Sequence, residues 1–228
     1  MKQILALVTG TCCLLSTVAI AESAAPLSAE TLVSYPGQTL TVVIHKAPNF
    51  IALTSGRNGT GLGAISAATE GNKLMREDQI PDPSLAVAVK LARMVQAKSG
   101  ATNIATLEDL GPLSTGDVAK IVNGKGLILE VWTYFWGFQL RPLDTEHYSV
   151  KYEANARILD PAGNPIAGAR CLSTPEDNTS FEQLTADHAA GLKALFIKAG
   201  STCTDAMAKV LLGAPASAQG NTASGDAQ

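Results

Sequence analysis

The sequence predicts a two-layer α+β fold. One layer is a four-stranded mixed sheet, made of one N-terminal strand and a three-strand antiparallel meander, and the other layer is formed by helices on one face of that sheet. Residues 126–172 show strand patterns separated by turns, and helical patterns flank them on both sides. The predicted divisions are a signal peptide over 1–21, a linker over 22–34, a single α+β domain over 35–212 and a disordered tail over 213–228.

The first strand of the sheet is predicted near the N-terminus, where β-branched residues dominate Thr39–Ala47. Residues 62–75 predict a helix in which Gly63, Ala67 and Gly71 recur at steps of four, a spacing that lets two backbones approach closely. We expect this helix to pack within the domain. An oligomer contact, or a membrane contact through 54–75, is the alternative that we do not favour.

Two further helices are predicted before the meander. Asp82 is a good N-cap and Pro83 fits the first helical position, so a helix is expected to run from there to Gly100. A short helix is expected around Thr115–Val122. Both helices are expected to end before Gly124, which precedes the meander.

The first strand of the meander, Gly126–Leu140, contains one charged residue, Glu130. Because a charge is seldom buried unpaired, we expect the face of Glu130 to be open, and alternation puts Trp132, Tyr134 and Trp136 on that same face. Gly137 marks a candidate bulge that would exchange the faces beyond it. The alternative is that these aromatic residues are core and Glu130 lies at an edge.

The middle strand, His147–Leu159, alternates regularly between apolar and polar residues, which is typical of a half-buried strand. A turn at 160–164 leads to the third strand. If Ile158 pairs with Ala167, Ala154 lies opposite Cys171 on the apolar face, whereas a one-residue slip would turn Cys171 to the polar face.

After the meander, a C-terminal helix is predicted from Thr179, with Glu182 completing a capping box. We expect Gly200 to interrupt this helix, and Thr202–Leu212 to resume it with Cys203 in the first turn. The helix would return Cys203 toward Cys171.

The N-terminus indicates export. Lys2 precedes a mostly apolar stretch that ends in Ala19-Ile20-Ala21, the pattern of a signal peptide cleaved after Ala21, with an uncleaved membrane anchor as the alternative. The residues before Cys12 do not form a lipobox. Cleavage leaves Cys171 and Cys203, which we expect to form a disulfide in an oxidising compartment. The mature chain would have 16 basic residues (17 minus Lys2) against 20 acidic ones, a net charge of −4.

Charge and motifs exclude several classes of function. The chain is mildly acidic overall and has no basic run, which disfavours nucleic-acid binding. Neither phosphate-loop spacing nor the HExxH and GxSxG motifs of zinc proteases and serine hydrolases occur in it. We therefore expect no enzyme, no metal site and no cofactor.

Three motifs resemble exported and lipoprotein-like proteins of Gram-negative bacteria: the Asp82-Pro83 helix start, VWTYFWGF (131–138) and YSVKYEANARILDPAGNPIAGARC (148–171). The likeness covers about residues 38–212. It implies an envelope location and carries over no functional residue, because no activity is established for that group. The layout is also similar to small accessory lipoproteins that assist outer-membrane assembly, from which this chain departs in lacking a lipobox.

The sequence therefore predicts a non-catalytic protein of the periplasm that binds a protein partner of the envelope, with self-association as a further option. Aromatic side chains ringed by polar groups are typical of protein interfaces. The rival prediction is a glycan- or peptidoglycan-binding module that stacks sugars on the same rings. The expected binding residues are Trp132, Tyr134, Trp136, Lys151, Arg157 and Arg170.

Overall fold

A computed structural model describes residues 37–54, 62–123, 126–144, 146–175 and 178–213. The predicted signal peptide and linker, and nearly all of the predicted tail, lie outside these residues, so those boundaries stay predictions.

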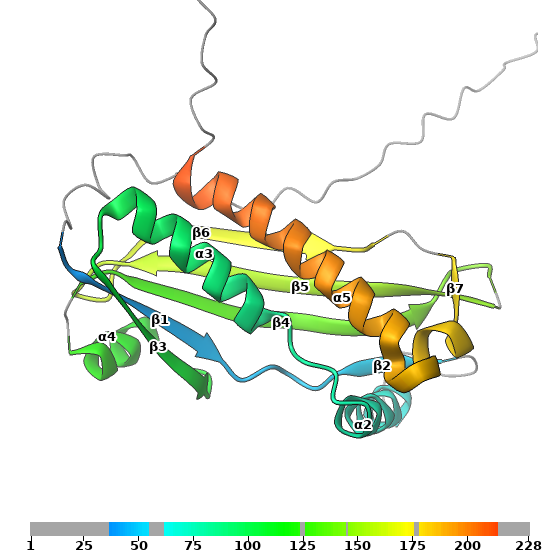
Figure 1. Ribbon diagram of the computed structural model, residues 1–228. Helices are drawn as coiled ribbons and strands as arrows, with labels where there is room; N and C mark the ends of the chain where they lie inside the picture. The colour runs from blue at the N-terminus through cyan, green and yellow to red at the C-terminus, as the bar shows by residue number, and fades with distance from the viewer. Residues whose placement is uncertain (1–36, 55–61, 124–125, 145, 176–177, 214–228) are drawn as a thin grey trace, which may run out of the picture.

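The described residues form one mixed sheet and the helices that pack on it (Figure 1). Its strands are β1 (Thr39–His45), β2 (Ile51–Leu53), β3 (Asn103–Leu110), β4 (Ile128–Leu140), β5 (His147–Leu159), β6 (Pro165–Ser173) and β7 (Thr179–Ser180). The strand order is β3-β1-β4-β5-β6, with β2 also pairing with β4 and β7 with β5. β1 runs parallel to both β3 and β4, whereas β4, β5 and β6 form the antiparallel meander.

The α+β class, the mixed sheet and the meander agree with the prediction, but the expected count of four strands is wrong. Three of the seven strands were not expected. β3 is an edge strand whose residues are nearly all exposed, so it lacks the apolar alternation that marks a half-buried strand. β2 and β7 have only three and two residues, which is too short for any periodicity.

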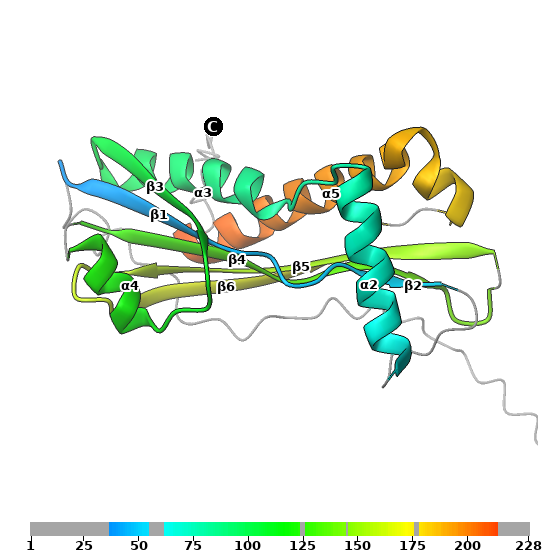
Figure 2. The same cartoon turned by 90° about the horizontal axis from the view of Figure 1, so that it is seen from below.

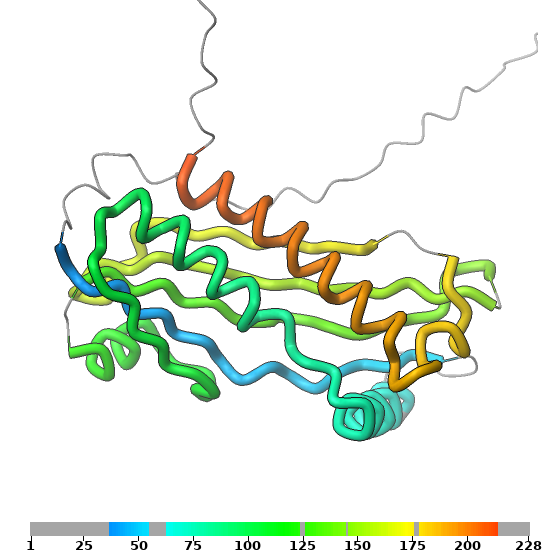
Figure 3. The backbone as a smooth tube through the Cα atoms, viewed as in Figure 1, coloured from blue at the N-terminus to red at the C-terminus, as the bar shows by residue number. Residues whose placement is uncertain are grey.

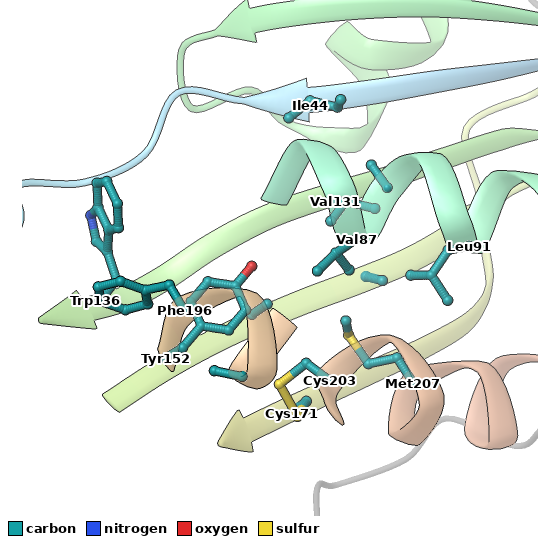
Figure 4. Packing of buried hydrophobic residues seen from close by; sticks show 14 of the residues in the cluster. Ile44, Val87, Leu91, Val131, Trp136, Tyr152, Cys171, Phe196, Cys203 and Met207 are labelled. Carbon is teal, nitrogen blue, oxygen red and sulfur yellow. A yellow bond between two sulfur atoms is a disulfide. The ribbon is translucent and has the colours of Figure 1, made fainter. Parts of the chain in front are cut away.

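The predicted register of the meander is confirmed. Ile158 pairs with Ala167 and Ala154 with Cys171, on the face that packs against the helices. On this face Cys171 bonds to Cys203 of α5 (Phe181–Leu212), with a sulfur–sulfur distance of 2.06 Å (Figure 4). The predicted disulfide therefore links the edge strand of the meander to the C-terminal helix.

Two helices cover one face of the sheet. α3 (Ser84–Ser99) and α5 lie side by side, and α5 runs obliquely across the meander (Figure 3). They bury the main core together with the apolar residues of β1, β4 and β5. Asp82 accepts the backbone N–H of Ser84, which confirms it as a cap for α3.

A third helix covers part of the opposite face, so the expectation that all helices lie on one face is wrong. Val118 of α4 (Thr115–Val122) packs in a second, smaller cluster with Val43, Ile128 and Leu159. These three sheet residues alternate with residues of the main core and so point away from it. Figure 2 shows α3 and α4 on opposite sides of the sheet.

The C-terminal helix differs from its prediction at two points. Its capping box uses Ser180 and Gln183, one residue after the expected pair. Gly200 does not interrupt α5: a Cβ there would lie 3.2 Å from the Cβ of Pro83, so this glycine lets the two helices approach. The irregular turn lies earlier, at residues 186–189.

α2 (Leu62–Glu77) packs within the domain, as expected. Ala67 is buried, and a Cβ on Gly71 would lie 2.2 Å from the backbone oxygen of Phe50. The close approach that the small residues permit is therefore made by the chain itself. Within the described ranges, no helix is both long enough and apolar enough to cross a membrane.

Candidate functional site

A β-bulge at Tyr134 divides the predicted aromatic row. On β4 the pairing with β5 passes from Thr133–Ala154 directly to Phe135–Glu153, so Tyr134 has no partner residue. The bulge exchanges the faces of the strand beyond it. Trp132 and Tyr134 therefore belong to one side of the sheet and Trp136 to the other.

Trp136 is a core residue, and the expectation that it is exposed is wrong. Its side chain is 1% exposed and packs edge-on against Phe50 and Phe196 (Figure 4). Its indole N–H donates to the backbone oxygen of Pro48 at 2.9 Å. The exchange of faces lies at Tyr134 rather than at Gly137. Gly137 is instead where β2 approaches β4, since a Cβ there would lie 2.1 Å from the oxygen of Ile51.

We call the part of the sheet surface that α4 leaves uncovered, opposite α3 and α5, the open face. It contains Trp132 and Tyr134 from β4, with Tyr134 62% exposed. β5 contributes Glu153, Asn155 and Arg157, and β6 contributes Arg170. Four of the six predicted binding residues, Trp132, Tyr134, Arg157 and Arg170, are therefore gathered on one surface.

Glu130 lies at the floor of the open face and is only 1% exposed. It is on the predicted side of β4, but it is buried because two cations cover it. Arg157, directly opposite on β5, donates its Nε–H to Oε2, and His45 at the end of β1 lies 2.5 Å from Oε1 through Nε2. The carboxylate is thus paired on both oxygens, which offsets the cost of burial.

His45 is held on both ring nitrogens. Nε2 faces the carboxylate of Glu130, and Nδ1 lies 2.9 Å from the backbone oxygen of Gly111. The Glu130 carboxylate and the Gly111 oxygen are both acceptors, so this arrangement favours a protonated ring that donates from both nitrogens. The bond to Glu130 accordingly raises the pKa of His45 in spite of its partial burial. Burial raises the pKa of Glu130, but the hydrogen bonds from His45 and Arg157 outweigh it and lower the net value.

The two arginines fix the two aromatic rings. The guanidinium carbon of Arg157 lies 5.2 Å from the centre of the Trp132 ring, and that of Arg170 lies 5.5 Å from the centre of the Tyr134 ring. Arg170 also forms an ion pair with Glu153. Each arginine therefore joins a carboxylate to an aromatic ring.

Two hollows lie on the open face and share Trp132 and Arg157. The first, of about 540 Å³, is lined by His45, Lys46 and Glu130 and by an apolar wall of Pro48, Pro112 and Leu113. The second, of about 350 Å³, extends along β5 and β6 to Arg170. The Trp132–Arg157 stack thus forms the boundary between them.

Lys151 lies on the same side of β5 as Glu153 and Arg157 but toward the opposite end of the strand from Arg157. It pairs with Gly137 across β4 and β5, six residues along β5 from Arg157, which corresponds to about 20 Å in a strand. Asp144, near the start of β5, accepts the backbone N–H groups of Glu146 and His147, so that acidic turn is explained by its own hydrogen bonds.

Sequence reasoning missed the role of His45 and the burial of Glu130. The available signal was the lone charge in an apolar strand, which requires a cationic partner if it is buried. Arg157 could be proposed from the meander register, but His45 comes from a strand distant in sequence. Among the described residues, no group of three or more His, Cys, Asp or Glu side chains is arranged to hold a metal ion.

No family model matches the chain, and no curated protein matches it. Solved structures with some likeness include a PelC dodecamer variant from Paraburkholderia phytofirmans, with 13% identity over 83% of this chain and 94% of that one and a TM-score of 0.37. The lipoprotein GNA1162 from Neisseria meningitidis has 15% identity over 73% of this chain and 96% of that one, with a TM-score of 0.28. Likeness this distant assigns neither an activity nor a partner.

Proposed function

We propose that this chain is an exported, non-catalytic binding protein of the Gram-negative cell envelope that contacts a protein partner through the open face. The observation that carries the proposal is the pair of stacked aromatic–arginine units, Trp132–Arg157 and Tyr134–Arg170, on a surface that helices leave uncovered. Trp, Tyr and Arg are the residues that dominate binding energy at protein interfaces.

The order of this surface supports a binding role. Ion pairs to Glu130 and Glu153 hold the arginines in place, so little side-chain freedom remains to be lost on association. The two adjacent hollows give a partner concave surface on both sides of Trp132. A preorganised aromatic centre with charged neighbours is what a protein interface requires.

The same ion pairs argue against acid–base catalysis. A general base needs a lone pair directed at substrate, but both nitrogens of His45 face protein oxygens, and both oxygens of Glu130 face protein nitrogens. Export is supported by the signal-peptide pattern and by the disulfide, which is typical of oxidising compartments.

Glycan binding is the second candidate, and the exposed ring of Tyr134 is the observation in its favour. Sugars stack on open ring faces. One side of each ring is already occupied by a guanidinium group, so at most one side of Trp132 and one of Tyr134 can stack. This makes a protein partner the better supported proposal.

Site-specific photo-crosslinking in cells tests the proposal. A photoreactive amino acid at position 134 should give adducts with one protein, and the same amino acid at position 197 should not. Ile197 is the matched control, because it is 72% exposed on α5, on the helical face of the molecule. Trp132→Ala should remove the adduct at position 134 while the protein stays folded. Loss of cell-wall pelleting in Trp132→Ala, with no protein adduct, would instead favour the glycan proposal.

A further inference from the structure

We propose that the first hollow, lined by Arg157, Lys46 and Trp132, is a carboxylate-binding site that takes an acidic group lying next to an apolar side chain of the partner. This inference rests on the proposed function and adds the chemistry that the partner presents. It follows from the charge, the free donors and the walls of the hollow.

The charge of the hollow is opposite to that of the protein. Its lining includes Lys46 and Arg157 against Glu130 alone, a surplus of one positive charge that becomes two when His45 is protonated. The whole chain has a net charge of −3. A local cationic site on an acidic protein favours a negatively charged group at this position over the rest of the surface.

Arg157 has hydrogen-bonding capacity left for a ligand. Its Nε–H donates to Glu130, and its guanidinium carbon lies over the Trp132 ring, 5.2 Å from the ring centre. Within the part of the chain that the structure describes, neither terminal guanidinium nitrogen donates to a protein acceptor. Two parallel N–H groups on a fixed plane match the two oxygens of a carboxylate.

The walls define what adjoins the carboxylate. Pro48, Pro112 and Leu113 are apolar, and the hollow of about 540 Å³ has the volume of a small ligand site. An acidic group with an aliphatic neighbour would place charge on Arg157 and Lys46 and apolar surface on this wall. A neutral sugar would not offset the positive surplus of this lining.

Titration of the isotope-labelled mature chain tests the proposal, with the indole N–H of Trp132 and the Nε–H of Arg157 as NMR reporters. N-acetyl-leucine should shift both signals saturably, and N-acetyl-leucinamide, which lacks the charge, should bind about tenfold more weakly or worse. Acetyl-Leu-Glu-amide compares a side-chain carboxylate with the terminal one. Saturable binding of either acid supports the proposal and shows which source the site prefers.

Variants locate the site. Arg157→Lys keeps the charge beside Glu130 but removes the planar donor pair, so it should weaken N-acetyl-leucine binding about tenfold while the protein stays folded. Arg170→Lys is the matched control, since Arg170 also stacks on an aromatic ring and pairs with a glutamate but lies outside the first hollow. It should leave binding unchanged.

Three results would overturn the inference: equal binding of acid and amide, tighter binding of inorganic phosphate than of either acid, or equal losses in Arg157→Lys and Arg170→Lys. None of them affects the crosslinking test at position 134. If crosslinking succeeds and the titration fails, the open face binds a partner by other chemistry. If both fail, the proposed function itself is wrong.

Discussion

Glu130 is the residue on which the Trp132 end of the open face depends, because its carboxylate is contacted by the two side chains that also contact the Trp132 ring, Arg157 and His45. Arg157 reaches it from β5 and His45 from β1, so a single buried side chain ties three strands together. Arg157 then stacks on Trp132, which also lies edge-on to His45 at 6.1 Å between ring centres. The position of Trp132 is thus a consequence of how the charge of Glu130 is paired, whereas Tyr134 is contacted by Arg170, which pairs with Glu153.

Glu130→Gln should therefore destabilise the protein by about 3 kcal/mol, since removing one member of a buried ion pair leaves the remaining charges uncompensated. Urea unfolding measures the loss. Lys73→Ala is the comparison, because both side chains of its ion pair with Glu77 are exposed and the pair should contribute only about 0–1 kcal/mol. Equal effects of the two substitutions would show that Glu130 does not organise the face.

The His45–Glu130 pair should also make stability depend on pH. The pKa of His45 is raised above 6.5, so its contribution is complete below pH 6.5 and is lost as the pH rises through the raised pKa. The pKa of Glu130 is lowered below 4.5, so its contribution is complete above pH 4.5 and is lost as the pH falls through the lowered pKa. The stabilisation from the His45–Glu130 pair is therefore complete between pH 4.5 and pH 6.5.

The alkaline side of this profile is the diagnostic one, because Asp144 and Asp160 also have lowered pKa values and contribute to the acid side. Unfolding free energies measured by urea from pH 5 to pH 9 should decline above neutrality in the wild type. In His45→Gln that decline should be reduced. An unchanged slope in the variant would mean that His45 is not held as an imidazolium.

At the scale of single elements, β4 shows where sequence patterns stop being sufficient. Alternation assigned Glu130 and Trp132 to the correct side, but the unpaired Tyr134 exchanges the faces after it, and nothing in its residue type marks a bulge. Gly137 was the obvious candidate for a bulge, yet it is glycine because β2 passes too close for a Cβ. Both facts depend on neighbouring strands and not on β4 itself.

The disulfide of the C-terminal helix was predicted correctly, although the capping residues and the interruption of that helix were not. The register of the meander and the position of Cys203 were enough to predict the disulfide, which joins residues 32 apart. Cys203→Ser should lower the free energy of unfolding by about 3 kcal/mol, chiefly by freeing the unfolded chain. Reduction of the wild type should cause the same loss, and a difference below about 1 kcal/mol in both experiments would contradict this account.

At the scale of the whole molecule, local patterns predicted the meander and remote pairings escaped them. β4, β5 and β6 are joined by short turns, so each strand's partner is its neighbour in sequence. β3 pairs in parallel with β1, more than 50 residues earlier, and its exposed residues carry no burial pattern. The contact between His45 and Glu130 could not be predicted for the same reason, because it depends on the remote pairing of β1 with β4.

At the same scale, the predicted export determines whether the disulfide can form and whether the chain can meet its proposed partner, because the periplasm is oxidising and that partner is expected in the envelope. The full chain expressed in a Gram-negative host should be recovered from the periplasm beginning at Glu22, because small residues at positions 19 and 21 match what the peptidase reads. Intact mass would show both the cleavage and the loss of two hydrogens at Cys171 and Cys203.

Replacing Ala19 and Ala21 by leucine should block processing and retain the chain at the membrane. A processed chain in that variant would show that cleavage does not occur after Ala21. An unprocessed wild type would favour the uncleaved anchor, in which case the open face would act beside the inner membrane.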